Sequence, residues 1–355
     1  CSSDLLHPKE SITTGDSGRV KIFNAFKSAE WDRQIGDRRE RNGWEARISG
    51  PSSALPIGSL IGRLCIPEGC GVKLCVTDRS DYYHQIGVSD ERSRSNVVWP
   101  AFPLRQFAHL EAYKRYMQKA QASLRPIDRT VHGDQLGGHR PQRLPTNPDA
   151  DVYGAFRAIL QGDHLGVEFG ISAHVGFLQE HSLLPDKGRL VTDRLVRPAE
   201  VYQGLCIDDF FALSPVPAED LGQPTAPKSK AYHVFRQAKQ CYEDANLAGS
   251  DPKDVVDADC GVVVGAEVDS RASTVAGGIL PVGCPASKRL ALSWIAAKAA
   301  ALPCTSDALH ASLLGGLVSA FCFRRCSMAV LEELFKVIPA TELQPDQPRT
   351  HPLSR

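Results

Sequence analysis

The 355-residue sequence predicts an α+β fold, and two observations carry that prediction. Short runs of β-branched, aromatic and other apolar residues, typical of strands, occur at 72–78, 205–213 and 262–268. Apolar residues at helical spacing mark the segments 108–122, 232–246, 287–302 and 306–338. With 42% hydrophobic and 23% charged residues, the chain can bury a sizeable core.

Composition favours a soluble, intracellular protein, nuclear or cytoplasmic. No apolar run approaches the roughly 18 residues that span a bilayer, and no signal peptide precedes the first element. The odd number of 11 cysteines, without paired spacing, predicts free thiols in a reducing compartment. Cys65, Cys70 and Cys75 resemble zinc ligands at first, but no histidine follows at finger spacing, so buried thiols are expected. Because the chain begins with Cys1 and not Met, a fragment is one reading.

The formal net charge is zero, yet two windows are basic. Residues 19–63 hold nine Lys or Arg against five Asp or Glu, and residues 105–143 hold eight against three. Basic patches of this kind can bind a phosphate backbone, and the alternative is a solvated charged face.

Adjacent carboxylates, Asp208 and Asp209, interrupt an apolar run where a tight hairpin would turn. Two carboxylates about 4 Å apart repel by roughly 4 kcal/mol at an effective dielectric near 20, so a cation between them is expected. Mg²⁺ prefers such oxygen ligands. An ordinary turn dipeptide is the alternative, and a third acid at another strand end, Asp78, favours the metal site.

An arginine-rich stretch precedes these acids, with four arginines from Arg33 to Arg41. The planar guanidinium group of arginine can bind two phosphate oxygens at once, so a triphosphate or the phosphate backbone of a nucleic-acid strand is an expected partner. A surface salt-bridge network with Asp32, Asp37 and Glu40 is the competing interpretation.

Three motifs resemble those of reverse transcriptases, and they follow one another along the chain in the same order as in that family. Thr77-Asp78-Arg79-Ser80-Asp81-Tyr82-Tyr83 is similar to the first catalytic motif of that family, and Cys206-Ile207-Asp208-Asp209 to its Tyr-x-Asp-Asp box, with Cys for Tyr. Arg33, Asp37, Arg39 and Asn42 follow the spacing of its fingers motif. The resemblance extends from about Trp31 to about Ile338 and covers most of the chain.

The resemblance implies a right-hand polymerase fold with fingers, palm and helical thumb. On this reading the chain divides into a disordered lead-in (1–18), fingers (19–71), palm with the first catalytic motif (72–100), fingers with a flexible insertion (101–150), palm with the remaining motifs and a primer-grip hairpin (151–270), thumb or connection (271–338) and a disordered tail (339–355).

The resemblance also implies an RNA-directed DNA polymerase of retroelement type that transfers dNTPs to a primer on an RNA or DNA template. Asp78, Asp208 and Asp209 would hold two Mg²⁺ ions, with Mn²⁺ as a substitute. The residues expected beside the substrate are Arg33, Arg39, Asp81, Tyr82, Tyr83, Gly166, Gly170 and Lys253.

Several of these residues have plainer readings. Tyr83 matches the family's ribose gate or is a core tyrosine, and Lys253 approaches a leaving pyrophosphate or is an ordinary turn lysine. Gly166 or Gly170 would open a helix over 172–179, without the family's usual Pro and Gln. His164 and His174 fit core or surface positions better than catalysis.

Two rival functions stay open. A decayed retroelement relic would keep the fold and some nucleic-acid affinity without activity, and Cys206 and the altered motif near Gly166 favour it. Another Mg²⁺-dependent phosphotransferase or nuclease would explain Asp78 and Asp208 but not the arginine-rich stretch.

Overall fold

Residues 5–12, 18–26, 29–30, 32–123, 144–336 and 350–352 are described by a computed structural model. The chain forms two compact units. Unit 1 comprises Cys1–Ser52 and Asp81–His174, and unit 2 comprises Ser53–Ser80 and Val175–Arg355. Half of the predicted lead-in lies outside the described residues, but residues 5–8 form a buried strand and so are not the disordered segment expected there. Most of the predicted insertion loop and tail also lies outside the described residues, and the fingers, palm and thumb boundaries stay a prediction.

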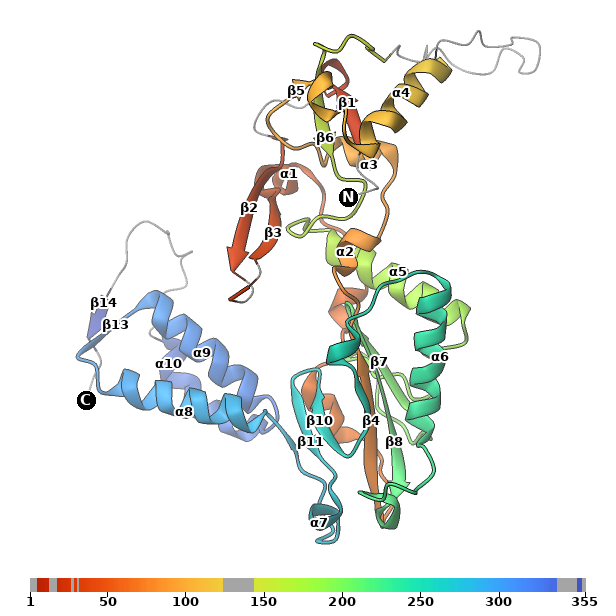
Figure 1. The fold of residues 1–355 in the computed structure, drawn as a ribbon. Coiled ribbons are helices and arrows are strands. Elements are labelled where there is room, and N and C mark those ends of the chain that lie inside the picture. The colour runs from red at the N-terminus through yellow and green to blue at the C-terminus, as the bar shows by residue number, and fades with distance from the viewer. Residues whose placement is uncertain are drawn as a thin grey trace. The chain divides into compact units, whose positions relative to one another are not determined.

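Unit 1 holds a three-stranded antiparallel sheet in the order β1-β6-β5 and a separate hairpin of β2 and β3 (Figure 1). The strands are β1 (Leu5–Pro8), β2 (Lys21–Phe26), β3 (Asp32–Asp37), β5 (Phe102–Pro103) and β6 (Asp151–Ala155), and the helices are α1 (Arg39–Trp44), α2 (Tyr82–Gln85), α3 (Asp90–Arg94) and α4 (Glu111–Ser123). Ala112 and Tyr116 of α4 pack with Leu6, Leu104 and Val152 around this sheet.

Helix α5 (Gly166–Glu180) begins in unit 1 and ends in unit 2. The sequence predicted that this helix spans 172–179, but it begins at Gly166, where Asp163 accepts a hydrogen bond from the backbone N–H of Leu165 at 3.0 Å. Gly170 therefore lies inside the helix and not in a loop before it.

Unit 2 is built on a four-stranded antiparallel sheet in the order β7-β8-β4-β9. Its strands are β4 (Cys70–Thr77), β7 (Tyr202–Cys206), β8 (Asp209–Pro217) and β9 (Val255–Ala258). Successive side chains of a strand point to opposite faces. Val72 and Leu74 of β4 therefore join one core cluster, while Cys75 joins another.

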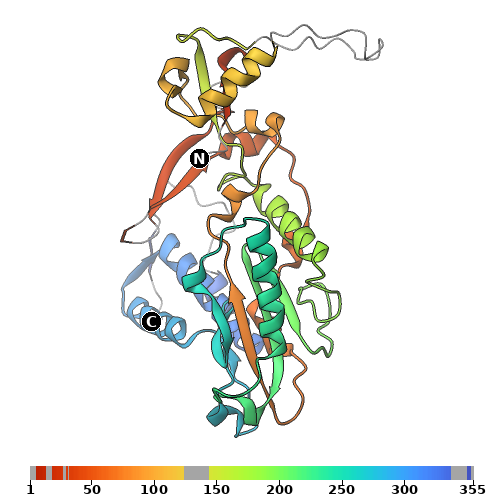
Figure 2. The ribbon, with the colours of Figure 1, turned by 45° about the vertical axis from the view of Figure 1, so that its right-hand side comes forward.

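One face of this sheet is covered by helix α6 (Lys230–Asp244), which Figure 2 shows lying along β8 and β4. Ala231, Phe235, Ala238 and Tyr242 recur at helical spacing and are buried. The Ser229 side chain accepts a hydrogen bond from the backbone N–H of Tyr232, which caps the helix. The predicted helix 232–246 is confirmed in type, with its start two residues earlier.

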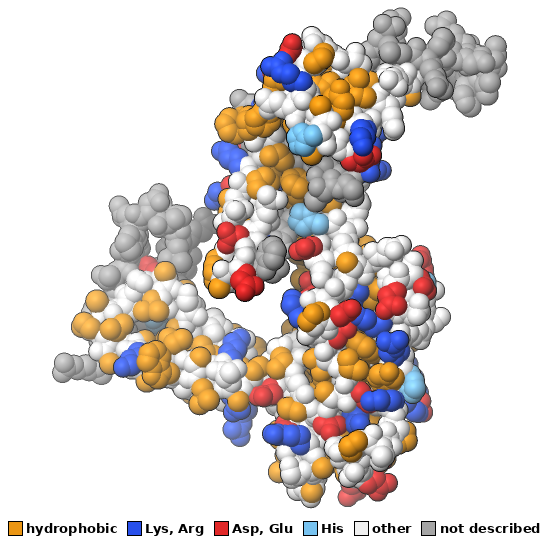
Figure 3. Space-filling view, in the orientation of Figure 1, with side chains coloured by type: hydrophobic (Ala, Val, Ile, Leu, Met, Phe, Trp, Pro, Cys, Tyr) orange, Lys and Arg blue, Asp and Glu red, His pale blue; other side chains and the backbone are white. Residues whose placement is uncertain are grey.

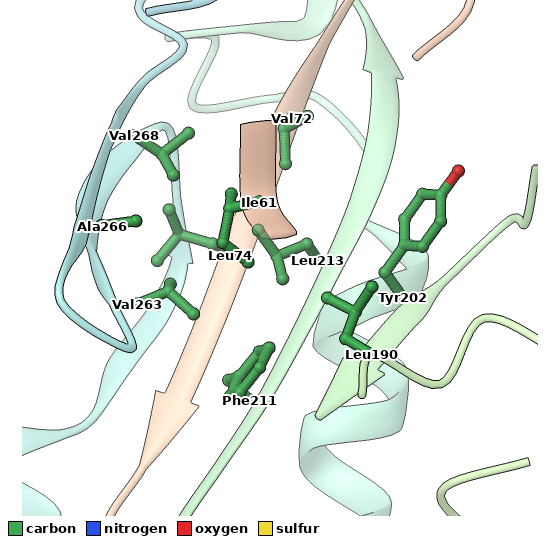
Figure 4. Close-up of a cluster of buried hydrophobic side chains, with 10 residues drawn as sticks. All are labelled: Ile61, Val72, Leu74, Leu190, Tyr202, Phe211, Leu213, Val263, Ala266 and Val268. Atoms are coloured by element: carbon green, nitrogen blue, oxygen red, sulfur yellow. The ribbon is translucent and has the colours of Figure 1, made fainter. Parts of the chain in front are cut away.

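The other face of the sheet packs against a second small sheet of β10 (Cys260–Val263), β11 (Ala266–Asp269) and β12 (Val282–Gly283). Val263 and Val268 from this sheet meet Leu74 and Phe211 in the core drawn in Figure 4. The hairpin expected over 262–268 is confirmed.

The C-terminal part of unit 2 is helical, with α7 (Ala272–Val275), α8 (Ala286–Ala300), α9 (Asp307–Phe321) and α10 (Glu332–Lys336), and two short strands, β13 (Cys304–Ser306) and β14 (Thr350–Pro352). Ser306 caps α9, since its side chain accepts a hydrogen bond from the backbone N–H of Leu309. The single helix predicted over 306–338 is wrong, because α9 ends at Phe321 and a 3₁₀ segment, Arg325–Leu331, separates it from α10. None of the described helices is long and apolar enough to cross a membrane.

The cysteine prediction holds in part. Cys75 is buried, Cys70 is half-buried and Cys65 is exposed, so burial accounts for one thiol of the three. Cys322 and Cys326 lie four positions apart in the segment expected to be one helix, but Cys322 follows the end of α9 and Cys326 lies exposed in the next 3₁₀ segment.

Candidate metal centre

The β7–β8 hairpin carries two of the predicted acids at its tip. Cys206 pairs with Asp209, so the two turn residues are Ile207 and Asp208. The turn therefore comes one residue earlier than the sequence predicted, and Asp209 is the first residue of β8. Ile207 has a φ of 61°, a left-handed conformation that is unusual for a β-branched residue and marks local strain.

Asp78 comes directly after β4, whose last residue, Thr77, pairs with Phe210 of β8. The register of two neighbouring strands thus brings Asp78 beside the hairpin tip. The backbone N–H of Arg79 donates to the carbonyl of Asp208 at 3.2 Å and ties the two strand ends together.

The three carboxylates meet as the sequence analysis expected. One oxygen from each of Asp78, Asp208 and Asp209 lies within 4.8 Å of the others. The pKa of Asp209 is raised to about 6, first by burial and then by the charges of Asp208 and Asp78. The cluster therefore concentrates negative charge that is incompletely balanced.

Lys253 supplies a positive charge to this cluster. It ends a short 3₁₀ segment, Asp251–Lys253, and its Nζ lies 2.9 Å from Asp78 Oδ2. This ion pair raises the pKa of Lys253 through the hydrogen bond and the charge of Asp78.

The donor set fits a hard divalent cation. Carboxylate oxygens are the ligands that Mg²⁺ and Mn²⁺ prefer, and three of them share one site here. Burial and, after it, the charges of Asp208 and Asp78 raise the pKa of Asp209, and a bound cation would favour its ionised form. Asp78, Asp208 and Asp209 are thus the residues that would hold metal.

Arg79 is a residue that the sequence analysis did not single out. Its side chain is buried although it is charged, with the guanidinium carbon 4.0 Å from the centre of the Tyr242 ring. It donates to Thr77 Oγ1 at 2.6 Å and to the carbonyl of Leu247 at 3.0 Å. The signal in the sequence was the cation directly after Asp78, at the end of a largely buried strand.

The predicted phosphate ligands Arg33 and Arg39 lie in unit 1. Arg33 is exposed on β3, and Arg39, at the start of α1, forms two hydrogen bonds to the Asp37 carboxylate at 3.0 and 2.8 Å. This bidentate pair lowers the pKa of Asp37 to about 2. Arg39 also lines a basic pocket of about 320 Å³ with Arg19 and Lys21, two cations that the motif did not indicate.

Arg38, next to Arg39, is part of a buried ion network in unit 1. Its Nη1 lies 2.7 Å from Asp163 Oδ2 and its Nη2 lies 3.0 Å from Glu45 Oε1. Arg92 contacts the same two carboxylates at 2.6 and 2.8 Å. Burial lowers the pKa of Arg38, and the charge of Asp163 opposes this effect. The network fixes the segment that carries Arg39.

Tyr82, Tyr83 and Gly170 come together within unit 1. The Tyr82 hydroxyl donates to the Gly170 carbonyl at 2.8 Å, and its buried ring lies 5.0 Å from that of His174. A Cβ on Gly170 would lie 3.2 Å from Tyr83 Cε1, so the glycine permits the close approach of α2 and α5. His174 is a core residue, as expected, and His164 is half-buried.

Asp81 and Gly166 complete the predicted set. Asp81 is exposed and adopts a left-handed conformation, with a φ of 45°, just before α2. Gly166 opens α5, where a Cβ would lie 2.9 Å from Ile159 Cγ2. The structure therefore brings Asp78, Asp208, Asp209 and Lys253 together in unit 2, and the substrate roles of the unit 1 residues stay predictions.

No protein-family model matches the sequence, and no curated protein matches it. The chain is similar to three solved structures of a foamy viral protease-reverse transcriptase. A dRH form in complex with double-stranded DNA is 11% identical with a TM-score of 0.53, over 95% of this chain and 41% of that one. Complexes with an RNA/DNA hybrid and with double-stranded DNA are 10% and 12% identical, each with a TM-score of 0.52, over 95% of this chain and 31% and 49% of theirs. This chain spans less than half of each viral protein, and it has a reverse-transcriptase-like fold.

Proposed function

We propose that this chain is the polymerase part of an RNA-directed DNA polymerase of retroelement type, with unit 1 supplying most of the fingers and unit 2 most of the palm and the helical thumb. The observation that carries the proposal is the meeting of Asp78, Asp208 and Asp209 within 4.8 Å at the end of an antiparallel sheet. The likeness of the fold to viral reverse transcriptases supports it.

In this proposal Asp78, Asp208 and Asp209 would hold two divalent ions, with Asp78 and Asp208 as the principal ligands and Asp209 completing the site. When bound there, the ions would lower the pKa of the primer 3′-hydroxyl and neutralise the negative charge of the leaving pyrophosphate. Asp78 follows β4 and Asp208 lies in the β7–β8 turn, so the pairing of β4 with β8 fixes their spacing before the reaction begins. Lys253 lies close enough to Asp78 for its ammonium to meet the leaving group.

The unit 1 residues would bind the incoming nucleotide. Arg33 and Arg39 would contact its triphosphate, which requires Arg39 to exchange the Asp37 carboxylate for a phosphate. Asp81 and Tyr82 would lie beside the nucleotide, and the Tyr83 ring would exclude a 2′-hydroxyl. Gly166 and Gly170 would shape the surface below the base.

Helix α8 offers a surface for a primer–template duplex. It carries Lys288, Arg289 and Lys298 and no acid, and Lys298 Nζ lies 5.4 Å from the centre of the Trp294 ring. Trp294 is 66% exposed and Leu290 is 72% exposed. Figure 3 shows hydrophobic and basic side chains together over this helical part of unit 2. Cations with an exposed aromatic ring suit a phosphate backbone and its sugars.

Primer extension tests the proposal. The chain is incubated with an RNA template, a DNA primer, dNTPs and Mg²⁺, and the products are resolved by length. We expect metal-dependent extension that Asp208→Asn lowers roughly 100-fold or more, since a ligand of both ions is lost. Asp193→Asn, which removes an exposed carboxylate of the same unit, serves as the matched control and should extend like the parent.

Assays of binding and of cleavage with the same primer–template separate the rival functions. Salt-dependent binding of the primer–template without incorporation would support a binding protein that has lost catalysis. Cleavage of the nucleic acid without extension would support a nuclease. Extension that persists in Asp208→Asn would show that the acid cluster is not the catalytic centre.

A further inference from the structure

Lys253 occupies the place where a cation is needed at the acid cluster. Its ammonium contacts Asp78 Oδ2 at 2.9 Å, and Asp78 is the acid that comes from the other strand end. The Lys253 side chain is 64% exposed while that of Asp78 is 19% exposed, so the lysine reaches the site from solvent. An exposed side chain of this kind can leave again at little energetic cost.

The loop that carries Lys253 is fastened to the acid-bearing strand end by main-chain contacts. The Ser80 backbone N–H donates to the Ala248 carbonyl and the Ser250 backbone N–H donates to the Asp78 carbonyl, both at 3.1 Å. Arg79 and Gly249 form an isolated bridge between these two bonds. The position of Lys253 is therefore tied to that of Asp78 itself.

The Arg79 side chain adds a second attachment. Its guanidinium lies over Tyr242 of α6 and donates to the carbonyl of Leu247, at the start of the same loop. Gly249 makes room for it, because a Cβ there would lie 2.7 Å from Arg79 Nη2 and 2.8 Å from Nη1. The guanidinium, the loop and the helix are thus packed as one assembly.

We propose that the Lys253 ammonium fills the cation position of the acid cluster when no divalent ion is bound, and that Arg79 is a positioning residue which holds the loop where Lys253 can do so. The inference rests on the metal site of the proposed function. Metal entry then requires the ammonium to leave Asp78. The affinity of the site for metal is consequently set by a competition within the chain, in addition to the three carboxylates.

Binding of Mn²⁺, followed by the electron paramagnetic resonance signal of the free ion, tests the competition without any catalysis. We expect Lys253→Met to lower the Mn²⁺ dissociation constant roughly threefold to fivefold, the change that corresponds to an exposed ion pair. Lys230→Met is the matched control, since the Lys230 side chain is 61% exposed and its Nζ lies 2.8 Å from Glu200 in an ion pair that includes none of the three acids. Its dissociation constant should equal that of the parent.

The role of Arg79 is tested through Lys253. Gly249→Ala keeps every charge and crowds only the guanidinium, so it should lower the Mn²⁺ dissociation constant in the same direction as Lys253→Met. Combined with Lys253→Met, it should add nothing, because both changes act through one ammonium. Arg79→Lys keeps the positive charge but replaces the planar guanidinium with an ammonium. Its Mn²⁺ dissociation constant should lie between those of the parent and Gly249→Ala, and circular dichroism reports whether each variant is folded.

Each outcome bears on one idea. If the parent binds Mn²⁺ and Asp208→Asn does not, the metal site stands, and an unchanged dissociation constant in Lys253→Met then overturns the competition. If the Gly249→Ala and Lys253→Met effects are additive, Arg79 does not act through Lys253. If neither the parent nor Lys253→Met binds Mn²⁺, the metal site of the proposed function is itself wrong.

Discussion

Replacing Asp209 with Asn should stabilise the metal-free protein at neutral pH. Burial and two neighbouring carboxylates raise the pKa of Asp209 from 3.8 to about 6. At about 1.36 kcal/mol per pKa unit this rise corresponds to roughly 3 kcal/mol for a fully shielded group. Because the residue is only half-buried, solvent screening reduces the expected gain to about 1 to 2 kcal/mol.

The sign of the pH dependence follows from proton binding. Between about pH 4 and pH 6 the folded protein binds a proton at Asp209 that the unfolded chain has released. The stability of the parent therefore falls as pH rises through this window, and the penalty is constant above it. Asp209→Asn lacks this penalty, so the two proteins should be equally stable near pH 4 and should differ most above pH 7.

Urea denaturation in EDTA, followed by circular dichroism from pH 4 to pH 8, measures the difference. Adding Mg²⁺ at 100 times its dissociation constant should stabilise the parent by about 2.7 kcal/mol and should stabilise Asp209→Asn much less. Our account of the cluster would be refuted by a variant no more stable than the parent at pH 7.5, or by an equal advantage at pH 4.

Three further substitutions test the packing. Gly204→Ala should destabilise unit 2 by about 1 to 3 kcal/mol, because its Cβ would lie 2.2 Å from the buried ring of Phe211, and urea midpoints report the loss. Gly315→Ala should raise the urea midpoint by the equivalent of about 1 kcal/mol, since beyond the adjacent residues and the backbone of its own helix no atom lies within 4 Å of the new methyl group in α9, and an unchanged midpoint would contradict this account. Asp163→Asn should cost about 3 to 5 kcal/mol in thermal or urea unfolding by leaving Arg38 buried without a full counter-charge, and a loss below about 1 kcal/mol would show that the network is not stabilising.

The central strands could be predicted because they depend on local pattern, and the meeting of the acids could be predicted because strand-end positions and the resemblance to reverse transcriptases both implied it. The strand ending at Thr77 has a continuous run of buried residues from Gly71 to Cys75, typical of a strand covered on both faces, and the position of Asp78 after it follows from the chain alone. The hairpin over 205–213 was recognisable for the same reason. Its turn was placed one residue late because apolar residues flank the pair of acids on both sides, and hydrophobicity alone does not fix the register.

The features that escaped prediction depend on contacts between distant residues. Arg38 reads as one more surface cation, and only its meeting with Asp163, 125 positions later, explains its burial. Arg79 is concealed in the same way, because Tyr242 and Leu247 come from a later part of the chain. The residues next to a charged residue in the sequence do not show whether the fold will bury it against a residue from a distant part of the chain.

The antiparallel pairing of β4 with β8 has a consequence for how such a protein can change over evolution. The acids at the two strand ends are 208 − 78 = 130 positions apart, yet one strand spacing separates their backbones. A lineage can lengthen, shorten or rewrite much of the intervening sequence while the acids keep their spacing. A single residue inserted into either strand end, by contrast, would turn one acid toward the opposite face and dismantle the site in one step.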